Sequence, residues 1–360
     1  MIYTEEQILD ALKHVQEPDL KQDLVTLNMI EDIQVEGNKI TFTVILTTPA
    51  CPLQKIIERD CKNAIRDYLS PEAEVDVKMT ARVTTRNANM FPNIKNIIIV
   101  SSGKGGVGKS TVASNLALAL NKKGAKVGLL DADIYGPSIP MMFGVMGARP
   151  DVKTVDGKHR MLPIEKHGIK LLSIGFFATP GQAIPWRGPM VSSAVKQLFN
   201  DADWGELDYL VVDFPPGTGD IHITVAQGFP VAGAVLVTTP QNVALADAAK
   251  GAGMFRMDAI NIPILGVVEN MSWFSPAELP ENKYYIFGKG GGTALAEQFD
   301  VPLLGEIPLV KAVSDAGDTG SPLVMEENHP VSQAFLNLAE KVAQQVAISN
   351  SRVNETVAPV

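Results

Sequence analysis

One glycine-rich segment of this chain combines the residue types that bind phosphate. Residues 101–111 read SSGKGGVGKST, and four of them match the P-loop spacing G-x-x-x-x-G-K-[ST]: Gly103, Gly108, Lys109 and Ser110. In a P-loop the backbone amides surround phosphate oxygens at a helix N-terminus, the lysine reaches the β and γ phosphates, and the hydroxyl group binds Mg²⁺. The spacing predicts a nucleotide site formed by Gly103, Lys104, Gly105, Gly106, Val107, Gly108, Lys109, Ser110 and Thr111.

The residues on either side of this loop favour the same interpretation. Asn96 to Ser101 reads NIIIVS, a buried strand, and a helix rich in Ala and Leu continues to Asn121, with Gly124 suited to end it. A strand, a glycine loop and a helix in this order make the match more specific than the spacing alone. Lys104 adds a second cation inside the loop. Burial of this cation would be costly unless it contacts an anion.

Acidic residues follow two further predicted strands. DADIYGPSIP, with Asp133, comes after a strand at 126–130, and Asp213 ends a strand at 207–213 and begins DFPPGTGD. Open α/β sheets bind ligands at the carboxyl ends of their strands. Asp213 therefore suits a Mg²⁺-bound water, and the Pro-Pro-Gly-Thr-Gly run suits a loop that senses the γ phosphate.

The elements that position these residues alternate between strand and helix. Further strands are predicted at 169–174, 233–238, 264–268 and 302–305, and helices near 190–200, 242–256, 293–299 and 330–347. Buried strands that alternate with helices indicate a mostly parallel sheet covered by helices on both faces, the α/β class of P-loop NTPases.

A small α+β domain precedes this sheet. A helix at 4–15 is followed by strands at 29–35 and 39–47, a helix at 52–69 and a strand at 75–81, in the order α-β-β-α-β. The resulting organisation is a small domain at 1–82, a linker at 83–95, an ATPase domain at 96–349 and a flexible tail at 350–360.

Composition excludes several classes of function. The 360 residues carry a formal net charge of -9, which opposes non-specific binding to nucleic acid or to anionic membranes. No apolar run reaches membrane-spanning length, and two cysteines exclude a disulfide framework. We therefore expect no nucleic-acid or membrane partner and a location in the reducing cytoplasm.

Three segments together resemble the deviant Walker A ATPases related to MinD, and specifically the Mrp/ApbC family of iron–sulfur cluster carriers: GKGGVGKST, DADIYGPS and DFPPGTGD. The resemblance covers most of residues 95–345. It extends to WRGPM from Trp186, to ENMS at 269–272 and to IFG at 286–288. The N-terminal part is similar to the small α+β domain that this family often carries, and TTPACP at 47–52 resembles its most recognisable motif.

The resemblance implies roles for individual residues in an ATP-hydrolysing homodimer. Lys104 would cross a nucleotide-sandwiched dimer to the partner's phosphates, as an arginine finger does, while Lys109 serves its own site. Asp133 would orient the attacking water, and Asp213 would hold the Mg²⁺ shell. Asn270 would hydrogen-bond adenine, although an Asn at a strand end can also simply cap a turn.

The sequence departs from the family at its usual cluster site. Typical members carry a Cys-x-x-Cys pair shortly after ENMS, so that two chains supply four thiolates, but residues 273–280 here read WFSPAELP. An iron–sulfur cluster usually has four protein ligands, and this chain has only Cys51 and Cys61. The usual cluster site is therefore absent, and a bound iron–sulfur cluster would need other ligands.

The two cysteines differ in their surroundings. Cys61 lies on the apolar face of its helix and is interpreted as a core residue. Cys51 precedes Pro52, a residue favoured at the first helical position, so its sulfur would lie near a helix N-terminus that stabilises a thiolate. Two alternatives stay open for Cys51: a metal or cluster ligand that works with a second chain or a client protein, and a structural cysteine in a tight turn. The histidines show no metal-ligand spacing and are interpreted as surface or core residues: His14, His159, His167, His222 and His329.

These observations favour a homodimeric ATPase that loads iron–sulfur clusters or transfers them to apo-proteins with the help of assembly factors. One rival is a positioning ATPase of the MinD or ParA kind, but residues 331–360 hold few Lys or Arg for a membrane or DNA surface. The other rival is a nucleotide-dependent scaffold or chaperone for metalloproteins that never holds a cluster, and the missing cysteine pair is compatible with it.

Overall fold

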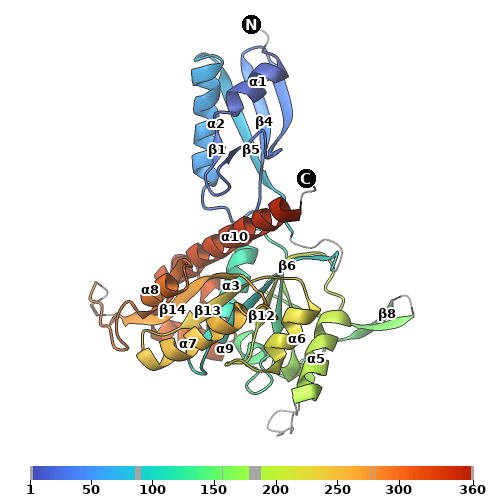
Figure 1. Cartoon of the computed structure of the whole chain (residues 1–360), viewed down its shortest axis with the longest axis vertical. Coiled ribbons are helices and arrows are strands. Elements are labelled where there is room, and N and C mark those ends of the chain that lie inside the picture. The colour runs from blue at the N-terminus through green and yellow to red at the C-terminus, as the bar shows by residue number, and fades with distance from the viewer. Residues whose placement is uncertain are drawn as a thin grey trace.

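The computed structural model consists of a small α+β domain above a larger α/β domain, with the last helix between them (Figure 1). It describes residues 3–85, 91–155, 157–177, 188–276, 278–279 and 281–357. Trp186 and Arg187, which contribute to the WRGPM motif, lie outside the described residues. Of the helices that are described, none is long and apolar enough to cross a membrane.

The small domain has the predicted order of helices and strands. Its elements are α1 (Glu5–Leu12), β3 (Ile30–Glu36), β4 (Lys39–Leu46), α2 (Gln54–Tyr68) and β5 (Glu74–Ala81). Thr4 caps α1, because its hydroxyl accepts from the Gln7 amide while the Gln7 side chain accepts from the Thr4 amide. β4 pairs with β3 antiparallel and with β5 parallel. A two-stranded ribbon, β1 (Gln16–Glu17) with β2 (Gln22–Asp23), was not predicted.

The large domain contains an eight-stranded sheet in the order β10-β11-β7-β12-β6-β13-β14-β15. Its strands are β6 (Ile94–Ser101), β7 (Val127–Asp131), β10 (Ile164–Lys166), β11 (Ile169–Ser173), β12 (Leu207–Asp213), β13 (Val231–Thr238), β14 (Ile264–Phe274) and β15 (Leu303–Leu309). Only the edge pair β10 and β11 is antiparallel. The prediction of a mostly parallel sheet is confirmed.

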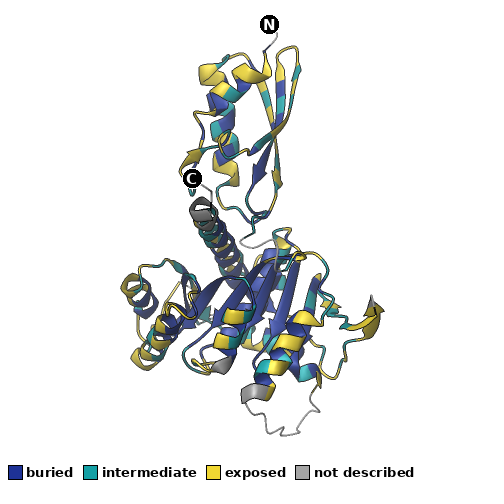
Figure 2. Cartoon of the chain, turned by 45° about the vertical axis from the view of Figure 1, so that its right-hand side comes forward, coloured by how far each residue is buried: buried dark blue, intermediate teal, exposed yellow. Residues whose placement is uncertain are grey.

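Helices cover both faces of this sheet (Figure 2). One face is packed by α3 (Lys109–Lys122), α4 (Ile139–Met142), α9 (Lys311–Thr319) and α10 (Pro330–Val357), and the other by α5 (Gly188–Asn200), α6 (Asp220–Gly228), α7 (Asn242–Phe255) and α8 (Gly291–Gln298). Alternate residues of β6 enter the two cores, with Ile98 and Val100 on the α3 side and Ile97 and Ile99 on the other. A run of consecutive apolar residues is therefore needed in this strand.

Several short elements were not predicted. They are the hairpin β8 (Val152–Val155) with β9 (Lys158–Met161), strand β10, helices α4, α6 and α9, and the 3₁₀ turns at Ile174–Phe177 and Leu323–Met325. The residues of the hairpin whose burial is described are exposed or half-buried, so they carry no buried alternation that would reveal a strand.

The C-terminal helix corrects one predicted boundary. We place a flexible tail from Asn350, but α10 continues to Val357 and Asn350 is fully buried. Its side-chain amide donates to Asn96 Oδ1 at 2.9 Å and to Thr84 Oγ1 at 3.2 Å. These bonds satisfy the amide nitrogen of a residue that looks like a chain end in the sequence, whereas its Oδ1 has no hydrogen-bond partner among the described residues. The other domain boundaries remain predictions, and β6 begins at Ile94, two residues before the predicted start of its strand.

Candidate nucleotide-binding site

The glycine-rich loop lies between β6 and α3, where the predicted strand and helix meet. Gly106 has φ 83° and Gly108, the residue that precedes α3, has φ 81°, a region that favours glycine. A Cβ at Gly108 would lie 2.1 Å from Asn270 Nδ2, and one at Gly103 would lie 2.0 Å from the Asp247 carbonyl carbon. The loop therefore requires glycine both for its backbone conformation and for its close approach to β14 and α7.

A cavity of about 280 Å³ opens over this loop. Its lining includes Lys104 and Lys109 from the loop, Asp133 from the segment after β7, and Pro216 from the segment after β12. Both loop lysines therefore face a space that is bounded by the two carboxylate-bearing segments.

Lys109 is the centre of the site's charges. Its Nζ lies 2.7 Å from Asp213 Oδ1, 3.3 Å from Asp133 Oδ2 and 3.3 Å from Ser110 Oγ, and its side chain is only 6% exposed. Burial opposes the charge, but Asp213 and Asp133 outweigh it and raise the pKa of Lys109 above its ordinary value. The fold thus brings together four residues predicted to form one site.

Two buried carboxylate oxygens in this cluster have no hydrogen-bond partner among the described residues. They are Asp213 Oδ2 and Asp133 Oδ1, which belong to the same side chains that bind Lys109 through their other oxygens. Burial raises the pKa of Asp213, and the neighbouring Lys109 acts in the opposite direction. Unpaired carboxylate oxygens beside the Ser110 hydroxyl are the hard oxygen donors that Mg²⁺ prefers, so the residues fit this metal.

Asp131 is a site residue for which the sequence analysis assigned no role. Its buried carboxylate accepts from Ser173 Oγ at 2.9 Å, from the Asp133 amide at 3.1 Å and from the Ile139 amide at 3.3 Å. Burial, followed by the nearby charge of Asp213, raises its pKa to about 8. Asp131 thereby positions the segment that carries Asp133. The sequence did contain a signal, because Asp131 follows its strand as directly as Asp213 does.

Asn270 contacts the loop itself. Its buried side-chain amide donates to the Val107 carbonyl at 2.8 Å, across 163 residues of sequence, so it links β14 to the P-loop rather than capping a local turn. Its expected contact with adenine remains a prediction.

Lys104 differs from Lys109 in having no ion pair with any residue that the structure describes. It is half-buried, and its backbone carbonyl accepts from Ser102 Oγ at 3.0 Å. The loop conformation is therefore fixed through the backbone while the ammonium group stays available to an anion.

Comparison with known proteins decides the family. The model described as "NUBPL iron-transfer P-loop NTPase" matches residues 93–343, most of the chain. The chain belongs to this family. A second model, described as "Iron-sulfur cluster assembly protein", matches residues 5–78, within the small domain.

Relatives of this P-loop NTPase align with nearly its whole length. An iron-sulfur cluster carrier protein from Synechocystis is 45% identical over 96% of this chain and 99% of its own, and one from Escherichia coli is 42% identical over 94% and 91%. Among solved structures, a nucleotide-binding protein from Archaeoglobus fulgidus in complex with ADP is 36% identical, with a TM-score of 0.58 over 69% of this chain and 94% of its own. These matches agree with the resemblance found in the sequence motifs.

The cysteines of this NTPase are only partly as predicted. Cys61 is fully buried, which confirms it as a core residue, and burial raises its pKa to about 12. For Cys51 the predicted position of Pro52 is wrong, because α2 begins at Gln54 and Pro52 lies in the preceding turn. Burial raises the pKa of Cys51 to about 11 although the amides of Leu53 and Gln54 oppose this shift. Burial therefore favours the neutral thiol of the half-buried Cys51 over the predicted thiolate.

No cluster of three or more His, Cys, Asp or Glu side chains suited to a metal ion occurs among the described residues. His222 is one of the histidines interpreted as surface or core, and it is a core residue. It lies on α6 with its ring edge-on to Phe214 at a centroid distance of 5.0 Å, and neither ring nitrogen has a hydrogen-bond partner within the described part of the chain.

Burial of His222 is expected to make folding sensitive to acid. Burial lowers its pKa from 6.5 to about 4, so the unfolded chain binds a proton in a range where the folded protein does not. Stability is therefore expected to be lost as the pH falls from about 6.5 to 4, by roughly 3 kcal/mol at about 1.4 kcal/mol per pKa unit. Urea unfolding of wild type and His222→Leu across this range measures the effect, and the leucine variant is expected to show a shallower slope. Parallel slopes would contradict it.

Proposed function

We propose that this NTPase is a homodimer that binds and hydrolyses ATP, and that its nucleotide state controls the loading of iron–sulfur clusters and their transfer to apo-proteins in the cytoplasm. The observation that carries the proposal is the convergence of Lys109, Asp133, Asp213 and Ser110 at a P-loop, in a chain of the iron-transfer NTPase family.

Each residue of the site would have a distinct role in hydrolysis. The amides from Gly105 to Ser110 would hold phosphate oxygens, and Lys109 would exchange its carboxylate partners for the β and γ phosphates. Asp133 has a free buried oxygen with which to accept a hydrogen bond from the attacking water, so that the water adds to the γ phosphorus as the bond to ADP breaks. Ser110 and Asp213 would hold Mg²⁺. When bound, this ion neutralises charge on the phosphates.

Two residues would extend the site beyond the phosphates of one copy. Lys104, which has no ion pair with a described residue, would reach the phosphates bound by the partner copy and stabilise charge as the γ phosphate leaves. Asn270 would contact adenine from the position where it already bonds Val107.

The cargo site is proposed at Cys51. This thiol is half-buried in the TTPACP loop, and it is the only partly accessible thiol of the chain, because the other cysteine, Cys61, is buried. A cluster would need Cys51 of both copies together with ligands from a client or an assembly factor. The rival scaffold function, in which ATP is used without any cluster, is favoured by the absence of a Cys-x-x-Cys pair from residues 273–280, because two copies then offer fewer thiolates than a cluster usually has as ligands.

Anaerobic reconstitution with iron and sulfide tests the cargo. Wild type is expected to gain visible absorbance and to pass the cluster to an apo acceptor, whereas Cys51→Ser is expected to lose both because serine replaces the thiolate ligand. Cys61→Ala is the matched control, because its sulfur is fully buried in the core, and it is expected to bind as wild type does. A wild type that binds no cluster would leave the scaffold as the function.

A further inference from the structure

The loop that carries Cys51 is docked on the large domain. This Cys51 loop, residues 47–52, connects β4 to α2 of the small domain. Ala50 is 1% exposed and packs in the core between the sheet and α3, and Thr48 is likewise 1% exposed. The small domain therefore contributes part of the NTPase core through the loop that bears its partly accessible thiol.

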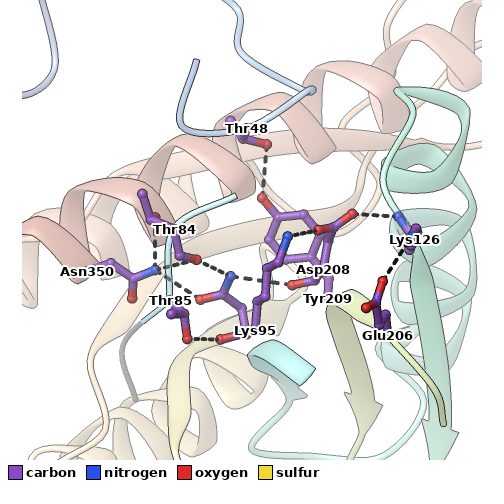
Figure 3. Close-up of polar contacts among 10 residues, drawn as sticks. Thr48, Thr84, Thr85, Lys95, Lys126, Glu206, Asp208, Tyr209 and Asn350 are labelled. Atoms are coloured by element: carbon purple, nitrogen blue, oxygen red, sulfur yellow. Dashed lines mark hydrogen bonds and ion pairs between the residues drawn. The ribbon is translucent and has the colours of Figure 1, made fainter. Parts of the chain in front are cut away.

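A tyrosine of the central sheet holds this loop. The Tyr209 hydroxyl donates to Thr48 Oγ1 at 2.9 Å (Figure 3). The Ala50 amide donates to the same oxygen at 3.2 Å. Tyr209 is 1% exposed, and its ring belongs to the same core as Ala50. The hydrogen bond joins residues that are 161 positions apart in the chain.

The P-loop helix meets the same loop at its far end. Gly124 follows α3, and a Cβ placed there would lie 3.8 Å from Pro49 Cβ, which is ordinary packing contact. The first residue of α3 is Lys109, at the nucleotide site. This helix thus spans the distance from the phosphate cradle to the Cys51 loop as one rigid element.

Helix α10 ties the two domains together at two further points. Gln344 Nε2 donates to Asp19 Oδ1 of the small domain at 2.7 Å. Asn350 bonds both Thr84, on the segment that leaves the small domain, and Asn96 of β6 (Figure 3). At these two points the small domain and the segment that leaves it are held against the large domain by buried or half-buried hydrogen bonds of α10.

The nucleotide site lies at one end of α3 and of β12, and the contacts of these two elements with the Cys51 loop lie near their other ends. Strand β12 carries Tyr209 near its start and Asp213 at its end, and the Lys109–Asp213 ion pair of 2.7 Å joins β12 to α3. Phosphates that take Lys109 away from Asp213 would remove this link. Both supports of the Cys51 loop would then change their arrangement together.

We infer that the nucleotide site controls access to Cys51, with Tyr209 and the end of α3 as the positioning elements that hold the Cys51 loop docked. The inference rests on the proposed function for its use of ATP, but it concerns the loop and not the cargo. A coupling of ordinary size changes an equilibrium about 5- to 150-fold, so the accessibility of Cys51 is expected to differ by about fivefold or more between nucleotide-free and ATP-bound protein.

Alkylation of the full-length protein measures this accessibility. Iodoacetamide is added at fixed pH without nucleotide, with ADP and Mg²⁺, and with a non-hydrolysable ATP analogue and Mg²⁺, and modified Cys51 and Cys61 are quantified by mass spectrometry. The alkylation rate of Cys51 is expected to rise about fivefold or more when the analogue binds, because the Cys51 loop is then less firmly docked. Cys61, which is fully buried, is expected to stay unmodified.

Tyr209→Phe tests the positioning role. It removes one hydroxyl but keeps the ring that fills the core, and Thr48 Oγ1 still accepts from the Ala50 amide. The variant is expected to alkylate faster at Cys51 without nucleotide and to lose most of the nucleotide dependence. Tyr3→Phe is the matched control, because it removes a phenolic hydroxyl that donates to Asn38 Oδ1 at 3.0 Å within the small domain, and it is expected to behave as wild type.

Three results would overturn the inference. They are an unchanged Cys51 rate in wild type that binds the analogue, a Tyr209→Phe variant that matches Tyr3→Phe, and modification of Cys61 in parallel with Cys51, which would report general unfolding. Hydrolysis and cluster reconstitution are measured on the same preparations. Normal hydrolysis with an unresponsive Cys51 removes the inference alone, whereas absent nucleotide binding removes the proposed function.

Discussion

Lys109→Ala is expected to abolish ATP hydrolysis, with a loss in kcat on the order of 10²–10³-fold or more, since one preorganised donor to transition-state charge is worth about that much. Lys109 is the buried cation at the centre of the site, 2.7 Å from Asp213 and 3.3 Å from Asp133. Phosphate binding is expected to weaken in parallel, and fluorescent nucleotide titration together with phosphate release measures the two effects.

The same substitution is expected to destabilise the large domain. Asp213 is fully buried, and without Lys109 it loses its cationic partner. Breaking a buried ion pair typically costs about 3–5 kcal/mol, and protonation of Asp213 relieves part of this cost. Addition of Asp213→Asn to Lys109→Ala is therefore expected to restore stability in urea unfolding without restoring hydrolysis. This double variant separates the catalytic loss from the folding loss.

Lys123→Ala is the matched control for Lys109→Ala. Lys123 directly follows the same helix, at the end opposite to the P-loop, and its partly exposed side chain pairs with Glu340 of α10. Its removal is expected to leave hydrolysis unchanged. An active Lys109→Ala, or a Lys123→Ala that is equally inactive, would contradict the assigned role.

The sequence predicted the parts of the site that local patterns determine. A strand, a glycine loop and a helix are local features, and Gly106 and Gly108 have the positive φ angles that the P-loop pattern requires. Asp133 and Asp213 were predicted because each follows a buried strand, and the fold brings both to Lys109. Strand ends of a parallel sheet share one edge, so proximity follows from topology.

The parts that were missed depend on contacts between distant segments. The Asp131 carboxylate accepts hydrogen bonds from the Ser173 hydroxyl and from the amides of Asp133 and Ile139. No spacing in the sequence predicts these partners. In the sequence Asn350 resembles a polar chain end, and only the fold shows that it bonds Thr84 and Asn96. Helix α2 begins at Gln54, two residues after Pro52, because Pro52 and Leu53 form a turn. The general preference for proline at the first helical position therefore does not hold here.

Lys104→Ala is expected to lower hydrolysis by about 10³-fold or more, the usual worth of a cation supplied in trans, while ATP binding and folding change little. Binding is retained because Lys109 remains, and folding is retained because Lys104 has no ion pair with any described residue. Phosphate release, nucleotide titration and urea unfolding together measure this pattern. Normal hydrolysis by Lys104→Ala would show that this lysine has no part in the reaction.

Mixing two inactive variants distinguishes action in trans from action within one copy. Asp133→Asn is expected to be inactive because it lacks the residue that orients water, but it still carries Lys104. In a mixed dimer, the copy with Lys104→Ala keeps its own Asp133 and receives Lys104 from its partner, so one of the two sites is complete. Statistical exchange between symmetric dimers should then restore about a quarter of wild-type hydrolysis. If Lys104 serves only its own copy, no mixed dimer contains a complete site and the mixture stays inactive.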